Sequence, residues 1–201
     1  PTETVQITAR DGMKLNALLL RPKGVDGAAP MVLEVHGGPA GQVKWEYHHF
    51  RQFLVNRGYA VLAVNFRGSS GLGKIYQAAG YGEYGRKMQD DLVDATLWAI
   101  DQGIADPKAI AINGRSYGGY ASAMGLVRDP DLFKAGIIEH AMLDVAYQSQ
   151  YPPHSWGLYL GQWERYFGDN NTLGNMEKMH QRSPINLVAQ MQAAALMLAG
   201  K

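Results

Sequence analysis

The stretch AIAINGRSYGGY (residues 109–120) decides the fold of this chain. A short apolar run, AIAI, leads into a sequence that fits G-x-S-x-G, and a plausible helix, ASAMGLVRD, follows. A serine between a strand and a helix must take a strained backbone conformation to lift its hydroxyl above the sheet. Residues two positions away, here Gly114 and Gly118, must then lack a Cβ. A plain glycine-rich turn is the alternative, but this context predicts a nucleophile elbow with Ser116 as the nucleophile.

Apolar runs of the same kind recur along the chain and are separated by stretches long enough for helices. Buried apolar strands that alternate with helices indicate a mostly parallel sheet covered on both faces. Asp11-Gly12 lies between two strand-like segments, which predicts an antiparallel β-hairpin at the N-terminus. Residues 145–182 are predicted to form an excursion of short helices. The predicted strands are 31–35, 60–66, 109–112, 135–138 and 194–199, and the clearest predicted helix is 87–102.

The composition excludes several classes of protein and site. The 201 residues carry 19 basic and 18 acidic side chains, which argues against nucleic acid or an anionic membrane as the partner. No apolar stretch reaches the roughly 20 residues that span a bilayer. The chain has no cysteine, so thiolate catalysis and cysteine metal sites are excluded. His48 and His49 are interpreted as a solvated pair rather than metal ligands, and neither a metal nor an organic cofactor is expected.

Two backbone N–H groups are candidates for an oxyanion hole beside the nucleophile. The N–H of Tyr117 lies at the start of the helix after the elbow, where the helix field favours a developing negative charge. The second donor is expected in HGGP (residues 36–39), where Gly38 is favoured over Gly37. His36 is interpreted as a structural hydrogen-bonding residue, because the base comes last in this chain order. An ordinary Gly-Pro turn is the alternative for this loop.

Four motifs stand out along the chain: HGGP (36–39), NFRGSSGLGK (65–74), GRSYGGY (114–120) and ERYFG (164–168). Together they resemble the catalytic domain of the prolyl oligopeptidase family of serine peptidases. Their order and spacing are similar to those of acylaminoacyl peptidases and dipeptidyl peptidases, over essentially the whole chain. ERYFG favours the dipeptidyl-peptidase branch, although that branch usually carries a tyrosine where this chain has His36. The resemblance implies an α/β-hydrolase fold and a serine peptidase that cleaves short peptides through an acyl-enzyme.

The resemblance also implies parts that residues 1–201 do not contain. The family pattern includes an N-terminal β-propeller, an acidic residue just after the strand that ends near Gly200, and a later histidine. Pro1 and the apolar C-terminal end both look like cuts. We therefore expect an incomplete α/β-hydrolase peptidase domain, truncated at its C-terminus, with the catalytic acid and base beyond residue 201. A second copy of the chain, or the missing propeller and C-terminal segments, is expected to cover the exposed sheet edge.

An internal catalytic triad is the alternative to this expectation. Asp144 follows the strand after the elbow helix and His180 comes later, so Ser116, Asp144 and His180 stand in a permitted order. His180 would have to reach back from the helical excursion. The family pattern favours a base outside the chain.

Aromatic residues gather in the excursion, which is predicted to lie over the carboxyl ends of the strands, where open α/β sheets bind ligands. The resemblance implies that Tyr166 lines the pocket for the residue before the scissile bond, and Trp163 is a second substrate-binding candidate. Packing of the excursion itself is the alternative for both rings. An aromatic wall suits proline or another apolar side chain. The cluster comprises Trp156, Tyr159, Trp163 and Tyr166.

Three rival functions fit parts of the sequence. Residues 68–74 satisfy the phosphate-binding pattern G-x-x-x-x-G-K, but Ile75 stands where a Ser or Thr should ligand Mg²⁺. A carboxylesterase would use Ser116 in the same way, and only the four-motif resemblance favours peptides over esters. A catalytically inactive binding module would have no need of a strained serine. The sequence therefore predicts a serine peptidase, with little activity in this fragment alone because an unassisted serine is a weak nucleophile.

Overall fold

The computed structural model describes residues 2–168 and 171–200. Its strands are β1 (Thr2–Thr8), β2 (Lys14–Leu20), β3 (Ala29–Val35), β4 (Ala60–Asn65), β5 (Ala105–Arg115), β6 (Ala135–Glu139) and β7 (Ala194–Leu198). Its α-helices are α1 (His49–Val55), α2 (Lys74–Ala78), α3 (Lys87–Asp101), α4 (Tyr117–Arg128), α5 (Val145–Gln150), α6 (Leu160–Phe167) and α7 (Asn175–Gln181). Two 3₁₀ helices complete the described elements, η1 (His154–Tyr159) and η2 (Pro184–Gln190).

The strands form one sheet in the order β1-β2-β4-β3-β5-β6-β7. β1 and β2 make the predicted antiparallel hairpin around Asp11-Gly12, and β2 joins β4 in an antiparallel pair. From β4 to β7 every neighbouring pair is parallel. The five apolar runs are confirmed as strands and the predicted helix 87–102 is confirmed as α3, while β5 begins earlier than predicted, at Ala105. The fold is therefore the α/β architecture expected from the sequence.

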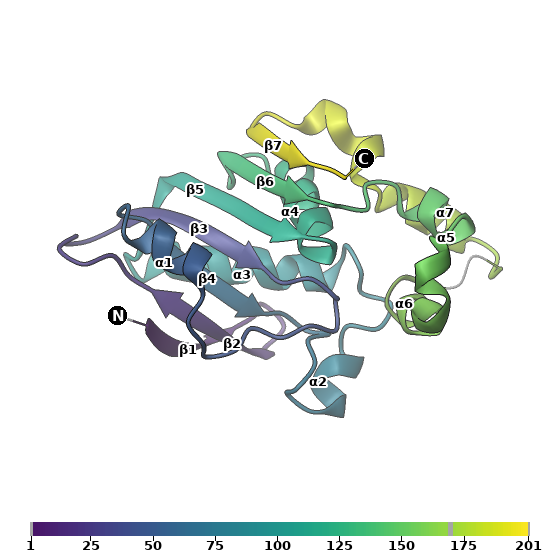
Figure 1. Ribbon diagram of the computed structural model, residues 1–201, viewed down its shortest axis with the longest axis horizontal. Coiled ribbons are helices and arrows are strands. Elements are labelled where there is room, and N and C mark those ends of the chain that lie inside the picture. The colour runs from purple at the N-terminus through teal and green to yellow at the C-terminus, as the bar shows by residue number, and fades with distance from the viewer. Residues whose placement is uncertain (1, 169–170, 201) are drawn as a thin grey trace.

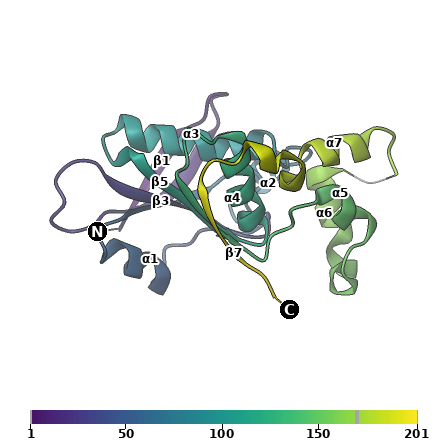
Figure 2. The same cartoon turned by 90° about the horizontal axis from the view of Figure 1, so that it is seen from above.

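The two faces of the sheet are covered unequally. Figure 2 shows α3 and α4 on one side of the sheet and α1 on the other. The main apolar core lies on the side of α3 and α4 and includes fully buried Leu33, Leu62 and Ile112. The cluster against Leu54 and Val55 of α1 is much smaller. It comprises Leu18, Leu20, Val43, Val61 and Ala63.

Strand β7 lies at the edge of the sheet and pairs with β6 alone among the described strands. All five of its residues are exposed, and Leu196 and Met197 keep 55% and 56% of their surface in contact with solvent. An apolar edge strand of this kind offers unpaired backbone groups and apolar side chains to whatever covers it. This exposure agrees with the expectation that a sheet edge is left open.

The loop after β4 is fixed by a buried ion-pair network. The guanidinium of Arg67 donates to both carboxylate oxygens of Asp91 on α3, at 2.7 to 3.1 Å, and to Asp11 in the hairpin, at 2.7 and 2.9 Å. The bond from Arg67 lowers the pKa of the Asp11 carboxyl to about 2. Because Arg67 is almost completely buried, the three elements it joins are held in one arrangement. This network anchors the segment that begins at Phe66.

The predicted excursion, described over residues 145–168 and 171–182, is helical as expected and contains α5, η1, α6 and α7. Figure 1 shows α5, α6 and α7 beyond the carboxyl ends of β3, β5 and β6. Residues 68–74, the rival phosphate-binding loop, lead into α2, a helix of only 5 residues. None of the described helices is long and apolar enough to cross a membrane.

Candidate active site

Ser116 occupies the sharp turn between β5 and α4. Its backbone has φ 59° and ψ −117°, a conformation that L-residues rarely adopt. The Ser116 N–H donates to the carbonyl oxygen of Glu139 at 2.9 Å, which fixes the turn to the end of β6. The side chain of Ser116 is exposed, so the turn presents its hydroxyl at the carboxyl edge of the sheet. The predicted nucleophile elbow therefore has the geometry that the motif requires.

The glycines on either side of Ser116 pack against backbone. A Cβ on Gly114 would lie 2.6 Å from the carbonyl oxygen of Val35, at the end of β3. A Cβ on Gly118 would overlap the same carbonyl oxygen, and one on Gly119 would lie 2.6 Å from the carbonyl oxygen of Glu139. Such separations are far below van der Waals contact, so only glycine fits. This confirms the reason for which glycine was expected at Gly114 and Gly118.

The HGGP loop lies directly against the elbow. A Cβ on Gly37 would lie 3.6 Å from the Cβ of Ser116. Gly38 has φ 128°, and a Cβ there would come within 2.5 Å of the Ala40 nitrogen, so this position also requires glycine. In the described part of the chain, no acceptor is recorded for the N–H of Gly38 or the N–H of Tyr117. Both N–H groups therefore remain available to a ligand.

His36 is held by hydrogen bonds on both ring nitrogens. Nδ1 lies 2.8 Å from the carbonyl oxygen of Gly37, and Nε2 lies 2.8 Å from Oγ of Ser69. The Ser69 hydroxyl lies within hydrogen-bond distance of two acceptors, the carbonyl oxygen of Phe66 at 2.7 Å and Nε2 of His36 at 2.8 Å. The Phe66 carbonyl also accepts the Ser69 N–H at 3.1 Å, so it keeps a donor when the hydroxyl proton points to Nε2. A neutral imidazole with its proton on Nδ1 satisfies every group. Burial lowers the pKa of His36 to about 4, against the opposing bond to Gly37, which favours this neutral form. The structural role predicted for His36 is the one the geometry supports.

This environment makes the stability of the protein depend on pH through His36. The pKa of His36 is about 4 in the folded protein and 6.5 in its usual environment. Between these pH values His36 is protonated in the unfolded chain and neutral in the folded protein. The free energy of unfolding is therefore expected to fall by roughly 2 to 3 kcal/mol through this group as the pH drops from 6.5 to 4. Urea unfolding of wild type and His36→Gln at pH 7 and pH 4.5 measures the effect. An equal loss in both proteins would contradict it.

The internal triad alternative is not assembled in the structure. Asp144 caps α5, where its Oδ1 accepts the N–H of Tyr147 at 2.9 Å. His180 is exposed on α7. Across residues 2–168 and 171–200, no hydrogen bond is recorded between Asp144 and His180 or to Oγ of Ser116. The geometry gives no support to a base within these residues.

Tyr166, the pocket residue that the resemblance implied, is tied to the loop after β4, and its role in substrate binding remains a prediction. Its side chain is fully buried, its hydroxyl donates to the carbonyl oxygen of Gly68 at 2.7 Å, and its ring packs edge-on against Tyr81. The reason is that α6 is tied to the loop between α2 and α3, where the Gly82 N–H donates to Arg165 at 2.8 Å. Tyr166 therefore links the excursion to the rest of the domain in the described structure.

Trp163 is half-buried, unlike its neighbour Tyr166. It stacks on Trp156 with ring centres 4.9 Å apart and planes 4° apart. The cavity that these two rings line with Phe167 has a volume of about 10 Å³, too small for a side chain. The role of Trp163 in substrate binding remains a prediction.

A larger cavity of about 380 Å³ opens beside the elbow, at the carboxyl ends of β3, β5 and β6. Glu34 borders it and pairs with buried Arg51 through two bonds of 2.9 Å. Open α/β sheets bind ligands at this edge. Within the described residues, no group of three or more His, Asp or Glu side chains is placed to hold a metal ion. Further lining residues include His36, Gly37, His48, Asn113, Gly114, Arg115 and Glu139.

The sequence alone did not single out the residues that support the site from the loop after β4. Phe66 and Ser69 are fully buried and both contact His36. The motif NFRGSS was noted only as part of a family pattern. The sequence did contain a signal for these supporting residues: polar and charged residues directly follow the apolar strand 60–66, at the sheet edge where Ser116 is also expected.

A strained serine at a strand-to-helix turn, with glycine-rich loops against it, defines the nucleophile elbow of an α/β hydrolase. The family model described as the Prolyl oligopeptidase family matches residues 45–201. The chain belongs to the prolyl oligopeptidase family.

Relatives with known names agree with this assignment. Dipeptidyl aminopeptidase BIII of Pseudoxanthomonas mexicana is 39% identical, over 98% of this chain and 30% of the relative. The acylaminoacyl peptidase of Pyrococcus horikoshii is 26% identical with a TM-score of 0.86, over 98% of this chain and 31% of that structure. A puromycin-hydrolyzing peptidase of Mycobacterium tuberculosis is 27% identical with a TM-score of 0.88, over 99% and 30%. The chain thus spans about 30% of the length of these relatives.

Proposed function

We propose that this chain is the nucleophile-bearing part of a serine peptidase that hydrolyses short peptides through an acyl-enzyme on Ser116. The observation that carries the proposal is the elbow itself, in which exposed Ser116 is held at φ 59°. Strain of this kind persists only where the surroundings enforce it, and it clusters at functional sites. The family membership and the names of the relatives support peptides rather than simple esters as substrates.

The oxyanion hole of this peptidase consists of the N–H groups of Tyr117 and Gly38. The absence of a recorded acceptor for either group within the described residues supports this assignment, as does the contact between Gly37 and Ser116. Tyr117 is also the first residue of α4, a helix of 12 residues whose N-terminus favours an anion. The two donors stabilise the tetrahedral intermediate as negative charge develops on the substrate oxygen.

The reaction proceeds in two stages. Ser116 Oγ attacks the scissile carbonyl while a histidine takes its proton, and the tetrahedral intermediate collapses as the same histidine protonates the leaving amine. Water then attacks the acyl-enzyme, again with the histidine as base, and releases the carboxylate product. Both ring nitrogens of half-buried His36 are engaged, and its pKa is lowered to about 4, which makes it a weak base; it therefore does not serve as the catalytic base.

The base and its acidic partner lie outside residues 1–201 in this proposal. The chain spans about 30% of the length of its relatives, so most of their length lies outside the part that matches. The further segments, or a second copy of the chain, cover the exposed apolar edge at β7.

Labelling with a fluorophosphonate, read by intact mass, tests this function. Such reagents react with a serine that is activated by a base, and Ser116→Ala is the matched control. We expect the complete protein to be labelled at Ser116 and residues 1–201 alone to remain unlabelled. Labelling of residues 1–201 alone would place the base within them and restore Asp144 and His180 as candidates. Absence of labelling in both forms would contradict the peptidase function.

A further inference from the structure

We propose that Phe66 is a positioning residue that holds the HGGP loop and the nucleophile elbow at the spacing the oxyanion hole requires. This inference rests on the proposed function, because it assigns a role within the same site. Phe66 directly follows β4 and is fully buried. It touches neither the serine nor the proposed donors through a recorded hydrogen bond, so it acts through the two side chains that it contacts.

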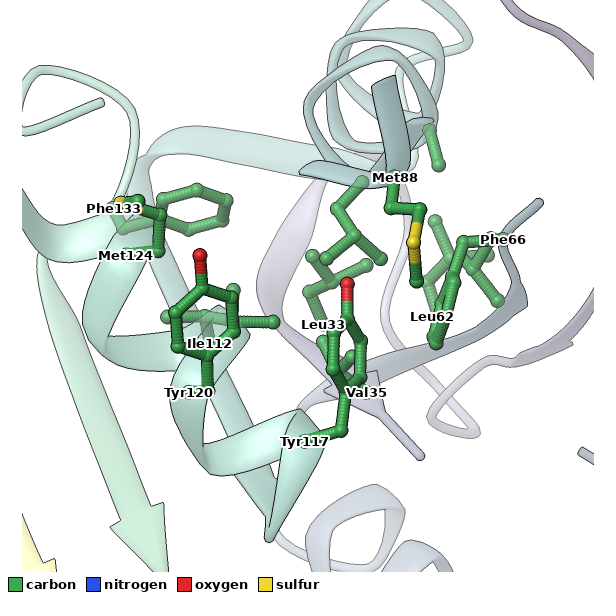
Figure 3. Packing of buried hydrophobic residues seen from close by; sticks show 14 of the residues in the cluster. Leu33, Val35, Leu62, Phe66, Met88, Ile112, Tyr117, Tyr120, Met124 and Phe133 are labelled. Carbon is green, nitrogen blue, oxygen red and sulfur yellow. The ribbon is translucent and has the colours of Figure 1, made fainter. Parts of the chain in front are cut away.

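The ring of Phe66 bridges the two halves of the oxyanion hole. It stacks on His36 with ring centres 4.3 Å apart and planes 16° apart. It also contacts the ring of Tyr117, at 5.1 Å and 36°. His36 opens the loop that carries one proposed donor, and Tyr117 supplies the other. Figure 3 shows Tyr117 and Tyr120 projecting from the start of α4 into the core, with Phe66 on the side of Tyr117 away from Tyr120.

The loop side of this bridge is restrained at more than one point. Ser69, three residues after Phe66, lies 2.8 Å from Nε2 of His36 and is itself fully buried. Arg67, between them, is fixed by Asp91 and Asp11. The segment after β4 therefore contacts the His36 imidazole twice, with the ring of Phe66 on its face and the hydroxyl of Ser69 at Nε2. A displacement of Phe66 would be transmitted to His36, and from there to the glycines that follow it.

The elbow side is equally confined. Tyr117 is fully buried, and its ring meets Tyr84 edge-on at 4.9 Å and Tyr120 at 5.8 Å. Tyr84 and Tyr120 therefore confine the ring of Tyr117 on one side, and Phe66 confines it on the other. Shortening Phe66 removes the flat surface shared by His36 and Tyr117, and close-packed interiors relax into such gaps only partly. Oxyanion donors must lie 2.7 to about 3.1 Å from the substrate oxygen, so a small shift of either backbone weakens stabilisation of the transition state.

Kinetics of matched core variants in the complete protein test the inference. Phe66→Leu is compared with Phe133→Leu, because Phe133 is also fully buried in the main core but packs against Gly125, toward the other end of α4. For Phe66→Leu we expect kcat on a peptidyl p-nitroanilide to fall about 10- to 100-fold, with KM changed less than about 3-fold. For Phe133→Leu we expect kcat within about 2-fold of wild type. Equal losses of kcat, or a loss confined to KM, would overturn the proposal.

A second variant covers the case in which Phe66→Leu does not fold. Ser69→Ala removes the hydroxyl at Nε2 of His36 and leaves the aromatic contacts in place. We expect kcat to fall about 3- to 10-fold without a change in KM. Ser183→Ala, at another fully buried serine, is its control and should leave kcat unchanged. An unchanged kcat in Ser69→Ala would show that the contact between Ser69 and His36 does not position the HGGP loop.

Failure of the proposed function is recognised separately. If the wild-type protein neither hydrolyses peptides nor reacts with a fluorophosphonate, the peptidase function fails, whatever the variants do. The positioning role is then decided by crystal structures of wild type and Phe66→Leu. It requires the backbone of His36 to Gly38 to move relative to Ser116 by more than about 0.5 Å, the tolerance of a catalytic constellation. A loop that stays in place would overturn it.

Discussion

Ser116→Ala is expected to lower kcat for peptide hydrolysis by about 10⁴- to 10⁶-fold in the complete protein. The loss is this large because the acyl-enzyme cannot form without the hydroxyl, and the oxyanion donors and bound substrate provide only residual acceleration. The same change should leave the free energy of unfolding within about 0.5 kcal/mol of wild type. Ser116 Oγ is exposed and has no recorded partner within the described residues, so removing it breaks no interaction.

The pairing of a catalytic loss with unchanged stability is what identifies a nucleophile. Steady-state kinetics on a peptidyl p-nitroanilide and urea unfolding measure the two quantities on the same preparations. Ser155→Ala, at an exposed serine in η1, serves as the control and should change neither. If Ser116→Ala retained a tenth or more of the wild-type kcat, another group would be the nucleophile. A large loss of stability would instead make Ser116 a structural residue.

The fold was predictable because its determinants are local. Each parallel strand is a short apolar run, and the elbow requires glycine at Gly114 and Gly118 for reasons that any strand-to-helix turn imposes. The packing distances show why the motif is so restrictive, since Val35 approaches both glycines at once. The hairpin at Asp11-Gly12 was equally local, because a short loop joins its two strands and Gly12 supplies the positive φ, 87°, that the loop needs.

The surroundings of the site were less predictable because they depend on contacts between distant residues. The motif around Tyr166 does not show that its hydroxyl bonds to the carbonyl oxygen of Gly68, which lies 98 positions earlier in the chain. Phe66 carries no polar group that would mark it, and only the folded chain brings its ring to His36 and Tyr117. Motifs identify the residues that perform chemistry, whereas the residues that hold them in place become visible only through packing.

Gly118→Ala is expected to destabilise the protein by more than about 4 kcal/mol, enough to leave little folded protein. The added Cβ would overlap the carbonyl oxygen of Val35, which is backbone and cannot rotate away. At glycines with more space around them, substitution by alanine is expected to change the free energy of unfolding much less. Gly161→Ala in α6 meets open space and should be neutral or stabilising by about 0.5 to 1 kcal/mol, through helix propensity alone. Gly125→Ala in α4 meets side chains at 3.2 Å and should fall between the two.

Soluble yield and urea unfolding of the three alanine variants measure this order. The three variants differ in what the new methyl group meets: open space at Gly161, side-chain atoms at Gly125 and backbone at Gly118. Any Gly118→Ala protein that does fold must have separated α4 from the end of β3. Because Val35 immediately precedes His36, that separation would also displace the HGGP loop, and Ser116 should lose its reactivity toward a fluorophosphonate. Wild-type stability together with wild-type labelling in Gly118→Ala would show that β3 and the elbow are not in contact.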